Sequence, residues 1–144
     1  MLPDVNVLVA AHHASHPHHR ISADWLQGTL GSANGQVVRL PMAVLSGFLR
    51  LVTHPKIFGQ PSTAAQAVDF IDWLLDDPAV RLLDSTQEWP SLRQLVLDKS
   101  MSANQIPDAW LAALALSLGE PFVTFDKDFR RLLPPSLLVL LRTA

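Results

Sequence analysis

Hydrophobic residues in this chain gather in short runs of two kinds. One kind is a nearly continuous apolar stretch, and it occurs in Val5–Ala10, Gln36–Leu40, Val80–Leu83 and Pro121–Phe125. Such stretches are typical of strands that are buried on both faces of a parallel sheet. The segment Leu137–Leu141 repeats the pattern near the end of the chain and predicts either a final strand or an apolar docking segment.

The other kind of run has apolar residues at helical spacing, bounded by residues that start or stop helices. Pro41 suits the first residue of a helix, Ser62 and Thr63 suit a helix cap, and Gly119 suits a helix stop. The predicted helices cover residues 17–30, 41–53, 62–75, 86–99, 106–118 and 128–132. The predicted turn and loops cover residues 31–35, 54–61 and 100–105.

Strands that alternate with helices predict a three-layer α/β/α sandwich around a mostly parallel sheet of four to five strands. The sequence contains no internal repeat and no low-complexity linker, so we expect one domain over residues 1–144. In such folds, ligands bind beyond the carboxyl ends of the strands, near a switch in strand order.

Composition narrows the function classes without selecting one. The chain is 49% hydrophobic and 17% charged, which is typical of a globular protein. It has no cysteine, which excludes disulfides and thiolate metal sites. We expect no membrane span, no signal peptide and a cytoplasmic location. The net charge of −2 gives no overall attraction to nucleic acid, so any positive charge that binds it must be local.

The candidate chemistry lies in four acids that flank the predicted elements. Asp4 adjoins the first apolar run, Asp108 opens the helix over 106–118, and Asp126 and Asp128 follow the fourth strand. Hard divalent cations take oxygen ligands, so these acids favour a site for Mg²⁺ or Mn²⁺ and a phosphodiester-cleaving enzyme. Ordinary explanations exist for three of them: an acid in the first helical turn for Asp108, and a turn and an N-cap for Asp126 and Asp128. Asp4 is harder to explain, because an unpaired acid beside a buried element is costly.

Four segments together resemble a known family. They are Asp-Val-Asn-Val-Leu-Val over residues 4–9, Val-Leu-Ser-Gly-Phe-Leu-Arg over 44–50 with Thr-His-Pro over 53–55, Asn-Gln-Ile-Pro-Asp-Ala over 104–109, and Thr-Phe-Asp-Lys-Asp-Phe over 124–129. In this order and spacing, they resemble the VapC-type toxins of the PIN-domain family. The resemblance covers essentially the whole chain.

The resemblance implies an endoribonuclease toxin of a type II toxin–antitoxin pair. It implies a PIN-like α/β/α fold, a homodimer, an RNA substrate and inhibition by a cognate VapB-like antitoxin. It also implies that Asp4, Asp108 and Asp126 hold a catalytic Mg²⁺ or Mn²⁺ and that Asp128 contributes to catalysis. Clustered carboxylates repel one another until a cation neutralises them, which agrees with that assignment.

One position departs from the family pattern. PIN domains carry a further acid early in the helix that follows the second strand, and here Met42 stands at that position. A thioether does not replace a carboxylate for Mg²⁺, because hard cations prefer oxygen. Ser46 or a water is a weak substitute. We therefore expect an active but weakened nuclease, with a catalytically inactive PIN-fold protein that binds an antitoxin or RNA as the alternative.

Five of the six histidines lie between Ala11 and Arg20. Zn²⁺ ligation is one interpretation, since neutral imidazole is a common ligand, but the spacing matches no standard structural zinc pattern. We therefore expect a solvated loop, placed where it could contact RNA phosphate with help from Arg20. A phosphoacceptor receiver domain is disfavoured, because it needs an acidic pair after the first strand, where His12 and His13 stand.

Overall fold

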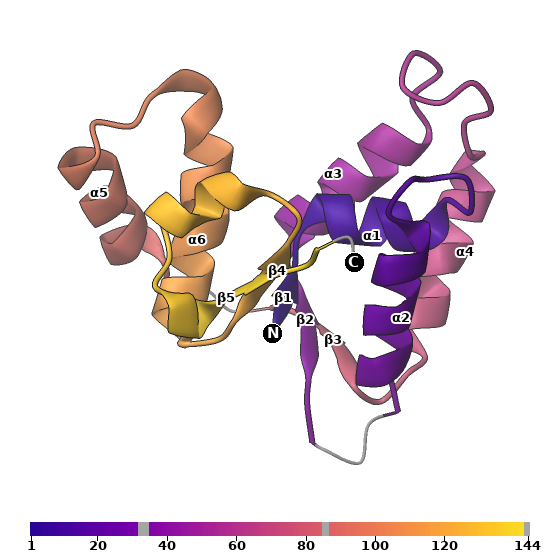
Figure 1. Ribbon diagram of the computed structural model, residues 1–144, viewed down its shortest axis with the longest axis horizontal. Helices are drawn as coiled ribbons and strands as arrows, with labels where there is room; N and C mark the ends of the chain where they lie inside the picture. The colour runs from indigo at the N-terminus through magenta and orange to yellow at the C-terminus, as the bar shows by residue number, and fades with distance from the viewer. Residues whose placement is uncertain (32–34, 85–86, 143–144) are drawn as a thin grey trace.

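The computed structural model describes residues 1–31, 35–84 and 87–142, which form short parallel strands flanked by helices (Figure 1). The strands are β1 (Leu2–Pro3), β2 (Val38–Leu40), β3 (Val80–Leu82), β4 (Phe122–Thr124) and β5 (Leu138–Leu140). The helices are α1 (Val5–His12), α2 (His19–Thr29), α3 (Met42–Val52), α4 (Ala64–Leu75), α5 (Trp89–Asp98) and α6 (Ile106–Leu118). Short 3₁₀ helices are η1 (Ala103–Gln105), η2 (Lys127–Arg131) and η3 (Pro135–Leu137).

The strands are all parallel, and they are divided between two sheets. One sheet has the order β1-β4-β5 and the other pairs β2 with β3. The prediction of a mostly parallel α/β fold is confirmed, but the four to five strands are split three and two. The two sheets meet at Met1, whose carbonyl accepts a hydrogen bond from the Arg39 amide at 2.9 Å. The Met1 amino group also donates to the Val37 carbonyl at 2.7 Å, so both backbone polar groups of Met1 join the two sheets.

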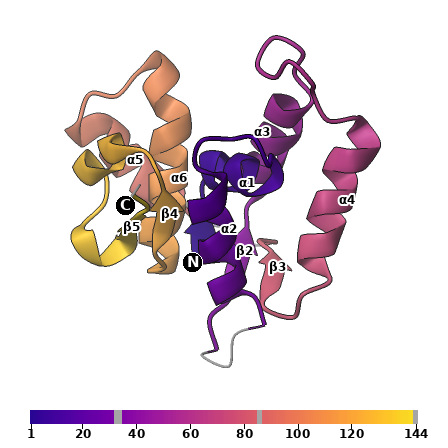
Figure 2. The same cartoon turned by 45° about the vertical axis from the view of Figure 1, so that its right-hand side comes forward.

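The helices lie on two sides of the strands (Figures 1 and 2). Helices α5 and α6 lie to one side of β1 and β4, and α1 to α4 lie to the other. From β1 the chain passes to β2, and it returns later as β4 on the opposite edge of β1. The gap between β1 and β4 is therefore a switch point in strand order, where open α/β sheets bind their ligands.

The prediction of a strand over Val5–Ala10 is wrong. This segment is helix α1, and the strand β1 precedes it. A short apolar run has no periodicity that separates a buried strand from a buried helix, and its three valines favoured the strand. The Asp4 side chain caps the helix, and α1 packs against both α2 and α3, which buries Val7 and Leu8 completely. Tertiary packing thus overrides local β-propensity here.

The close approach of α3 to α1 requires a glycine. A Cβ built on Gly47 would lie 2.9 Å from Cγ2 of Val5, which is shorter than normal van der Waals contact. Val5 is the first residue of α1 and follows Asp4 directly. Gly47 in the Leu-Ser-Gly-Phe motif therefore lets α3 pack beside the start of α1.

The remaining boundaries agree closely with the sequence patterns. Helix α6 has the predicted bounds and ends at Gly119, whose positive φ of 64° is the left-handed conformation that favours glycine. Helix α4 begins after Thr63, which caps it together with Gln66. Part of the predicted turn over 31–35 and the start of the predicted helix over 86–99 lie outside the described residues. Among the described helices, none is both long and apolar enough to cross a membrane.

Candidate active site

Asp4 lies at the carboxyl end of β1 and begins helix α1. Its Oδ1 accepts a hydrogen bond from the Val5 amide at 2.7 Å, as an N-cap does. Only 8% of the residue is exposed, and it is the one acidic residue in the buried class among those described. Because β1 precedes α1, Asp4 lies at the rim where an open parallel sheet binds ligands.

Asp4 is held from the neighbouring strand by Thr124. The Thr124 hydroxyl donates to Asp4 Oδ2 at 2.6 Å and accepts from the Asp126 amide at 3.0 Å. The parallel register pairs Pro3 with Val123, so the next residue on each strand, Asp4 and Thr124, lie side by side. The sequence placed Thr124 beside the acids, and the structure shows that its hydroxyl orients one of them.

Asn6 is a site residue that the sequence interpretation missed. Its Nδ2 donates to Asp4 Oδ2 at 3.0 Å and to Thr124 Oγ1 at 3.2 Å, and its Oδ1 accepts from the Phe125 amide at 3.4 Å. The available signal was a polar side chain within an otherwise apolar run, two residues after Asp4. Asn6 reaches Asp4 because Asp4 caps α1 and Asn6 lies in the first turn of that helix.

The environment of Asp4 opposes its negative charge. Burial raises the pKa of Asp4 from 3.8 to about 6, against the hydrogen bonds from Thr124 and Val5, which lower it. The charges of Asp108 and Asp126 raise this pKa further. Asp4 is thus a carboxylate near two other acids, and none of the groups that shift its pKa is a cation.

Asp108 lies in the first turn of α6, next to a cavity. Burial raises the pKa of Asp108, and the charges of Asp126 and Asp128 raise it further. The cavity has a volume of about 570 Å³, and its lining residues include Asn104, Asp108, Asp128 and Arg131. Asp108, from a segment more than 100 residues beyond Asp4, therefore belongs to the same acidic region.

Asp126 and Asp128 have structural roles as well. Asp126 caps η2 by accepting from the Asp128 amide at 2.8 Å, which is the ordinary explanation that the sequence offered. Asp128 is exposed and lies 3.8 Å from Arg131, a long contact between two exposed side chains. Such surface pairs contribute little to stability, so Asp128 remains free to change partners.

The four acids share one region but do not form a closed cage. Within residues 1–31, 35–84 and 87–142, no three Asp, Glu, His or Cys side chains are grouped so that they could hold a metal ion. Their electrostatic influence on one another nevertheless places Asp4, Asp108 and Asp126 near enough to repel. Mg²⁺ keeps several waters and needs few protein ligands, so this all-oxygen donor set suits it without a cage.

Met42 begins helix α3 directly after β2 and Pro41, and it is 62% exposed. This position lies at the carboxyl end of β2, the strand that adjoins β1 through Met1. The missing acid of the family pattern therefore falls at the same edge of the fold as Asp4. Ser46, the weak substitute, is exposed one turn further along α3.

The prediction of a solvated histidine loop is wrong in part. His12 lies within α1 and contacts the rings of Phe48 and Phe70, and its Nε2 is 2.8 Å from Ser62 Oγ. His13 stacks on Phe58, and His18 stacks on Phe125. Aromatic partners near the segment, which the sequence alone does not place, explain the difference. Burial and neighbouring histidines lower the pKa of both His12 and His16.

Comparison with known proteins identifies the family. The PIN domain matches residues 1–132. The chain belongs to the PIN-domain family. VapC ribonuclease Mb2897 of Mycobacterium bovis is 38% identical over 131 residues, which cover 89% of this chain and 86% of that protein. Ribonuclease VapC31 of Mycobacterium tuberculosis is 36% identical over 131 residues, covering 90% and 91%.

A solved structure supports the PIN fold. The crystal structure of VapBC2 from Rickettsia felis, bound to a DNA fragment from their promoter, matches with a TM-score of 0.64 at 17% identity. The match covers 98% of each chain. The resemblance to VapC-type PIN domains that the four motifs indicated is therefore confirmed.

Proposed function

We propose that this PIN domain is a metal-dependent endoribonuclease and the toxin of a type II toxin–antitoxin pair. The observation that carries the proposal is the buried carboxylate of Asp4, fixed by Thr124 at the switch point and repelled by Asp108 and Asp126. A group of acids that repel one another at a ligand-binding rim favours a cation from solution. The relatives named VapC ribonucleases support RNA as the substrate.

In this proposal Asp4, Asp108 and Asp126 hold Mg²⁺ or Mn²⁺, and Asp128 contributes from the exposed side. When bound, the metal activates a water and stabilises negative charge on the scissile phosphate. Thr124 and Asn6 each donate a hydrogen bond to Asp4 Oδ2, and Asn6 also donates to the Thr124 hydroxyl, so the carboxylate is held in one orientation. The cavity beside Asp108 and Asp128 gives the RNA strand access to the acids.

We further propose that the protein forms a homodimer and is inhibited by a VapB-like antitoxin. The solved structure with a similar fold is named VapBC2, a name that combines two proteins. Large apolar side chains on this chain are exposed, including Trp89 at 66% and Leu97 at 59%. Exposed apolar groups of this size are typical of surfaces that contact other proteins.

The direct test measures cleavage of structured RNAs in Mg²⁺, in Mn²⁺ and in EDTA. We expect cleavage with either metal and none in EDTA, and we expect Asp4→Ala and Asp108→Ala to abolish it while the fold is retained by circular dichroism. A parent protein that binds metal but cleaves no RNA would contradict the proposal.

The rival function is a catalytically inactive PIN domain that binds an antitoxin or RNA. Two points favour it: Met42 begins α3 where the family resemblance implies an acid, and no three metal-binding side chains within the described ranges form a ready cage. The variant Met42→Asp separates the two functions. We expect it to tighten Mg²⁺ binding and to raise cleavage several-fold over the parent, because it adds one oxygen ligand at the same edge.

The matched control is Gln27→Asp, which adds the same charge on an exposed position of α2. If Met42→Asp creates cleavage where the parent has none, the rival function is correct for this chain. If both variants leave metal binding and cleavage unchanged, Met42 does not occupy a ligand position.

A further inference from the structure

The short helix η2 lies between two cavities, one lined by both acids and cations and the other by cations without acids. A 3₁₀ helix has about three residues per turn, so side chains three positions apart lie on one face. Asp128 and Arg131 face the cavity beside Asp108, whereas Lys127 and Arg130 line a second cavity of about 460 Å³. Phe129, between them, is buried in the core. Helix η2 therefore directs Asp128 and Arg131 to the first cavity, and Lys127 and Arg130 to the second.

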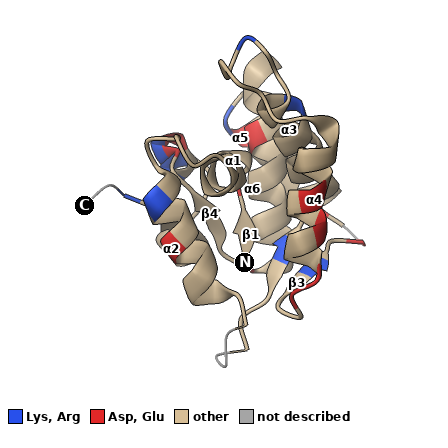
Figure 3. Cartoon of the chain, turned by 90° about the vertical axis from the view of Figure 1, so that its right-hand side faces the viewer, with Lys and Arg blue, Asp and Glu red and all other residues tan. Residues whose placement is uncertain are grey.

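This second cavity, which we call the basic pocket, is lined by cations and lacks acids. Its lining residues are His18, Phe125, Lys127, Arg130, Leu140, Leu141 and Arg142. Among the described residues, the ion pairs leave Lys127, Arg130 and Arg142 without an acidic partner. Figure 3 shows basic segments near the upper end of α2 and in the last described residues of the chain. Uncompensated cations that converge on a concave surface attract an anion.

His18 lines the basic pocket together with these cations. Its Nδ1 is buried without a hydrogen-bond partner, although buried polar atoms are normally paired. The ring stacks on Phe125, with centroids 4.5 Å apart and planes inclined by 17°. Phe125 lies between Thr124 and Asp126 in the sequence. The stacked pair thus connects the basic pocket directly to the segment that carries the acids.

We propose that the basic pocket binds a phosphate group of the RNA strand, next to the phosphate that lies at the acids. This inference rests on the proposed function, because it assigns the RNA backbone as the source of the phosphate. Arginine and lysine are the side chains that bind phosphate, and arginine donates two parallel hydrogen bonds to it. Lys127 lies between Asp126 and Asp128, so one strand crossing η2 would meet the pocket and the acids in succession. The net charge of −2 makes such a local site necessary for binding RNA.

The test measures binding of a uridine octanucleotide in EDTA, where divalent metal is absent, over a range of salt concentrations. The variant Arg130→Gln/Arg142→Gln removes two cations of the pocket from separate elements and leaves Lys127 beside the acids. We expect its dissociation constant to rise about tenfold and its salt dependence to fall by about 0.7 per lost phosphate contact. The control Arg81→Gln/Arg93→Gln removes two exposed cations from β3 and α5, outside the basic pocket. We expect this control to bind RNA with the same affinity and salt dependence as the parent.

Inorganic phosphate is titrated in parallel, to separate a strand from a free anion. We expect it to bind far more weakly than the octanucleotide and to lose binding in the pocket variant. Equal affinity of the two double variants for RNA overturns the proposal, as does phosphate binding as tight as that of RNA. The proposed nuclease function is tested separately, by metal-dependent RNA cleavage. If cleavage is absent, RNA binding in EDTA still tests the basic pocket.

Discussion

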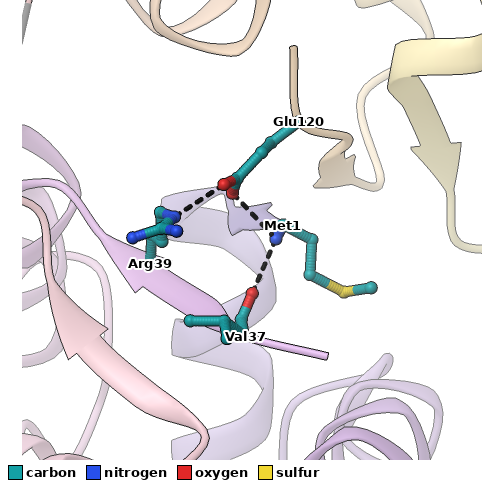
Figure 4. Close-up of polar contacts among 4 residues, drawn as sticks. All are labelled: Met1, Val37, Arg39 and Glu120. Atoms are coloured by element: carbon teal, nitrogen blue, oxygen red, sulfur yellow. Dashed lines mark hydrogen bonds and ion pairs between the residues drawn. The ribbon is translucent and has the colours of Figure 1, made fainter. Parts of the chain in front are cut away.

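Carboxylates at the two ends of the strands have pKa values that are shifted in opposite directions. At the amino ends of the strands, Glu120 accepts from Arg39 Nε at 2.6 Å and from the Met1 amino group at 3.2 Å (Figure 4). These hydrogen bonds and charges lower the pKa of Glu120 against burial, which acts in the other direction. At the carboxyl ends, burial and two neighbouring acids raise the pKa of Asp4 to about 6.

This difference separates an acid with a structural role from an acid that we propose binds a metal ion. Glu120 joins β2 to the segment before β4 with charges that the chain itself supplies. Asp4 is held by Thr124 and Val5, but among the described residues it forms no ion pair with a cation. Buried charges are normally paired, so an unpaired one at a ligand-binding rim supports the proposal that a cation binds there.

The largest expected effect is the loss of cleavage in Asp4→Asn. The substitution keeps the shape of the side chain and removes its negative charge, so we expect RNA cleavage in Mg²⁺ to fall about 100-fold or more. Glu120→Gln is the matched control at the other end of the sheet, and it should retain cleavage while losing stability. Initial rates of RNA cleavage on both purified variants measure the contrast. Equal losses in the two variants would remove the distinction between these acids.

The next effect concerns the hydroxyl that orients Asp4. Thr124→Val keeps the volume of the side chain and removes the donor to Asp4 Oδ2, and we expect cleavage to fall about 10- to 100-fold. Thr53→Val is the control, since its hydroxyl donates only to the Leu49 carbonyl at the end of α3. Cleavage rates at saturating Mg²⁺ separate the two, and full activity in Thr124→Val would show that Asn6 suffices to orient Asp4.

The packing beneath Asp4 is tested by Gly47→Ala. Alanine gains about 1 kcal/mol over glycine in a helix, but the clash with Val5 costs about 1–3 kcal/mol, so we expect a net loss of about 1 kcal/mol. Gly28→Ala, on α2 with open space around it, should instead gain about 0.5–1 kcal/mol. Urea denaturation measures both changes. Adding Val5→Ala to Gly47→Ala should reduce the loss of stability that Gly47→Ala causes. If the effects of the two substitutions simply add, the steric explanation is contradicted.

The smallest effect is the pH dependence that arises from Glu120. Because the pKa of Glu120 is lower in the folded state than its ordinary 4.5, its ion pair contributes stability above that pH. This contribution, about 1 kcal/mol for a partly exposed pair, is lost as the pH falls through the lowered pKa. Urea denaturation between roughly pH 3 and pH 7 measures this contribution, as the difference in stability between the parent and Glu120→Gln. A parallel pH dependence in the two proteins would contradict this assignment.

Local patterns were sufficient wherever one residue decides the structure. Gly119 ends α6 because its left-handed backbone favours glycine, and Thr63 caps α4 because its side chain accepts a helical amide. The order of the acids along the chain, with the segments around them, was enough to indicate the family. The sequence also revealed the departure at Met42, because the absence of an acidic residue can be recognised without a structure.

Other features depend on contacts between distant segments, and the sequence did not reveal them. The run Val5–Ala10 is compatible with either a strand or a helix, and its packing against α2 and α3 selects the helix. The histidines near Ala11 acquired aromatic partners such as Phe58 and Phe125 from elsewhere in the chain. The basic pocket gathers residues from three separate segments around η2.

By itself, the sequence determined which groups are available: carboxylates beside buried elements, no cysteine, and a methionine where the family resemblance implies an acid. Only the tertiary structure decided their chemistry. It set Thr124 against Asp4 across 120 positions of sequence and buried the carboxylate beside two others. Burial and electrostatic repulsion are sums over neighbours in space, so a carboxylate acquires an altered pKa only when the fold brings those neighbours together.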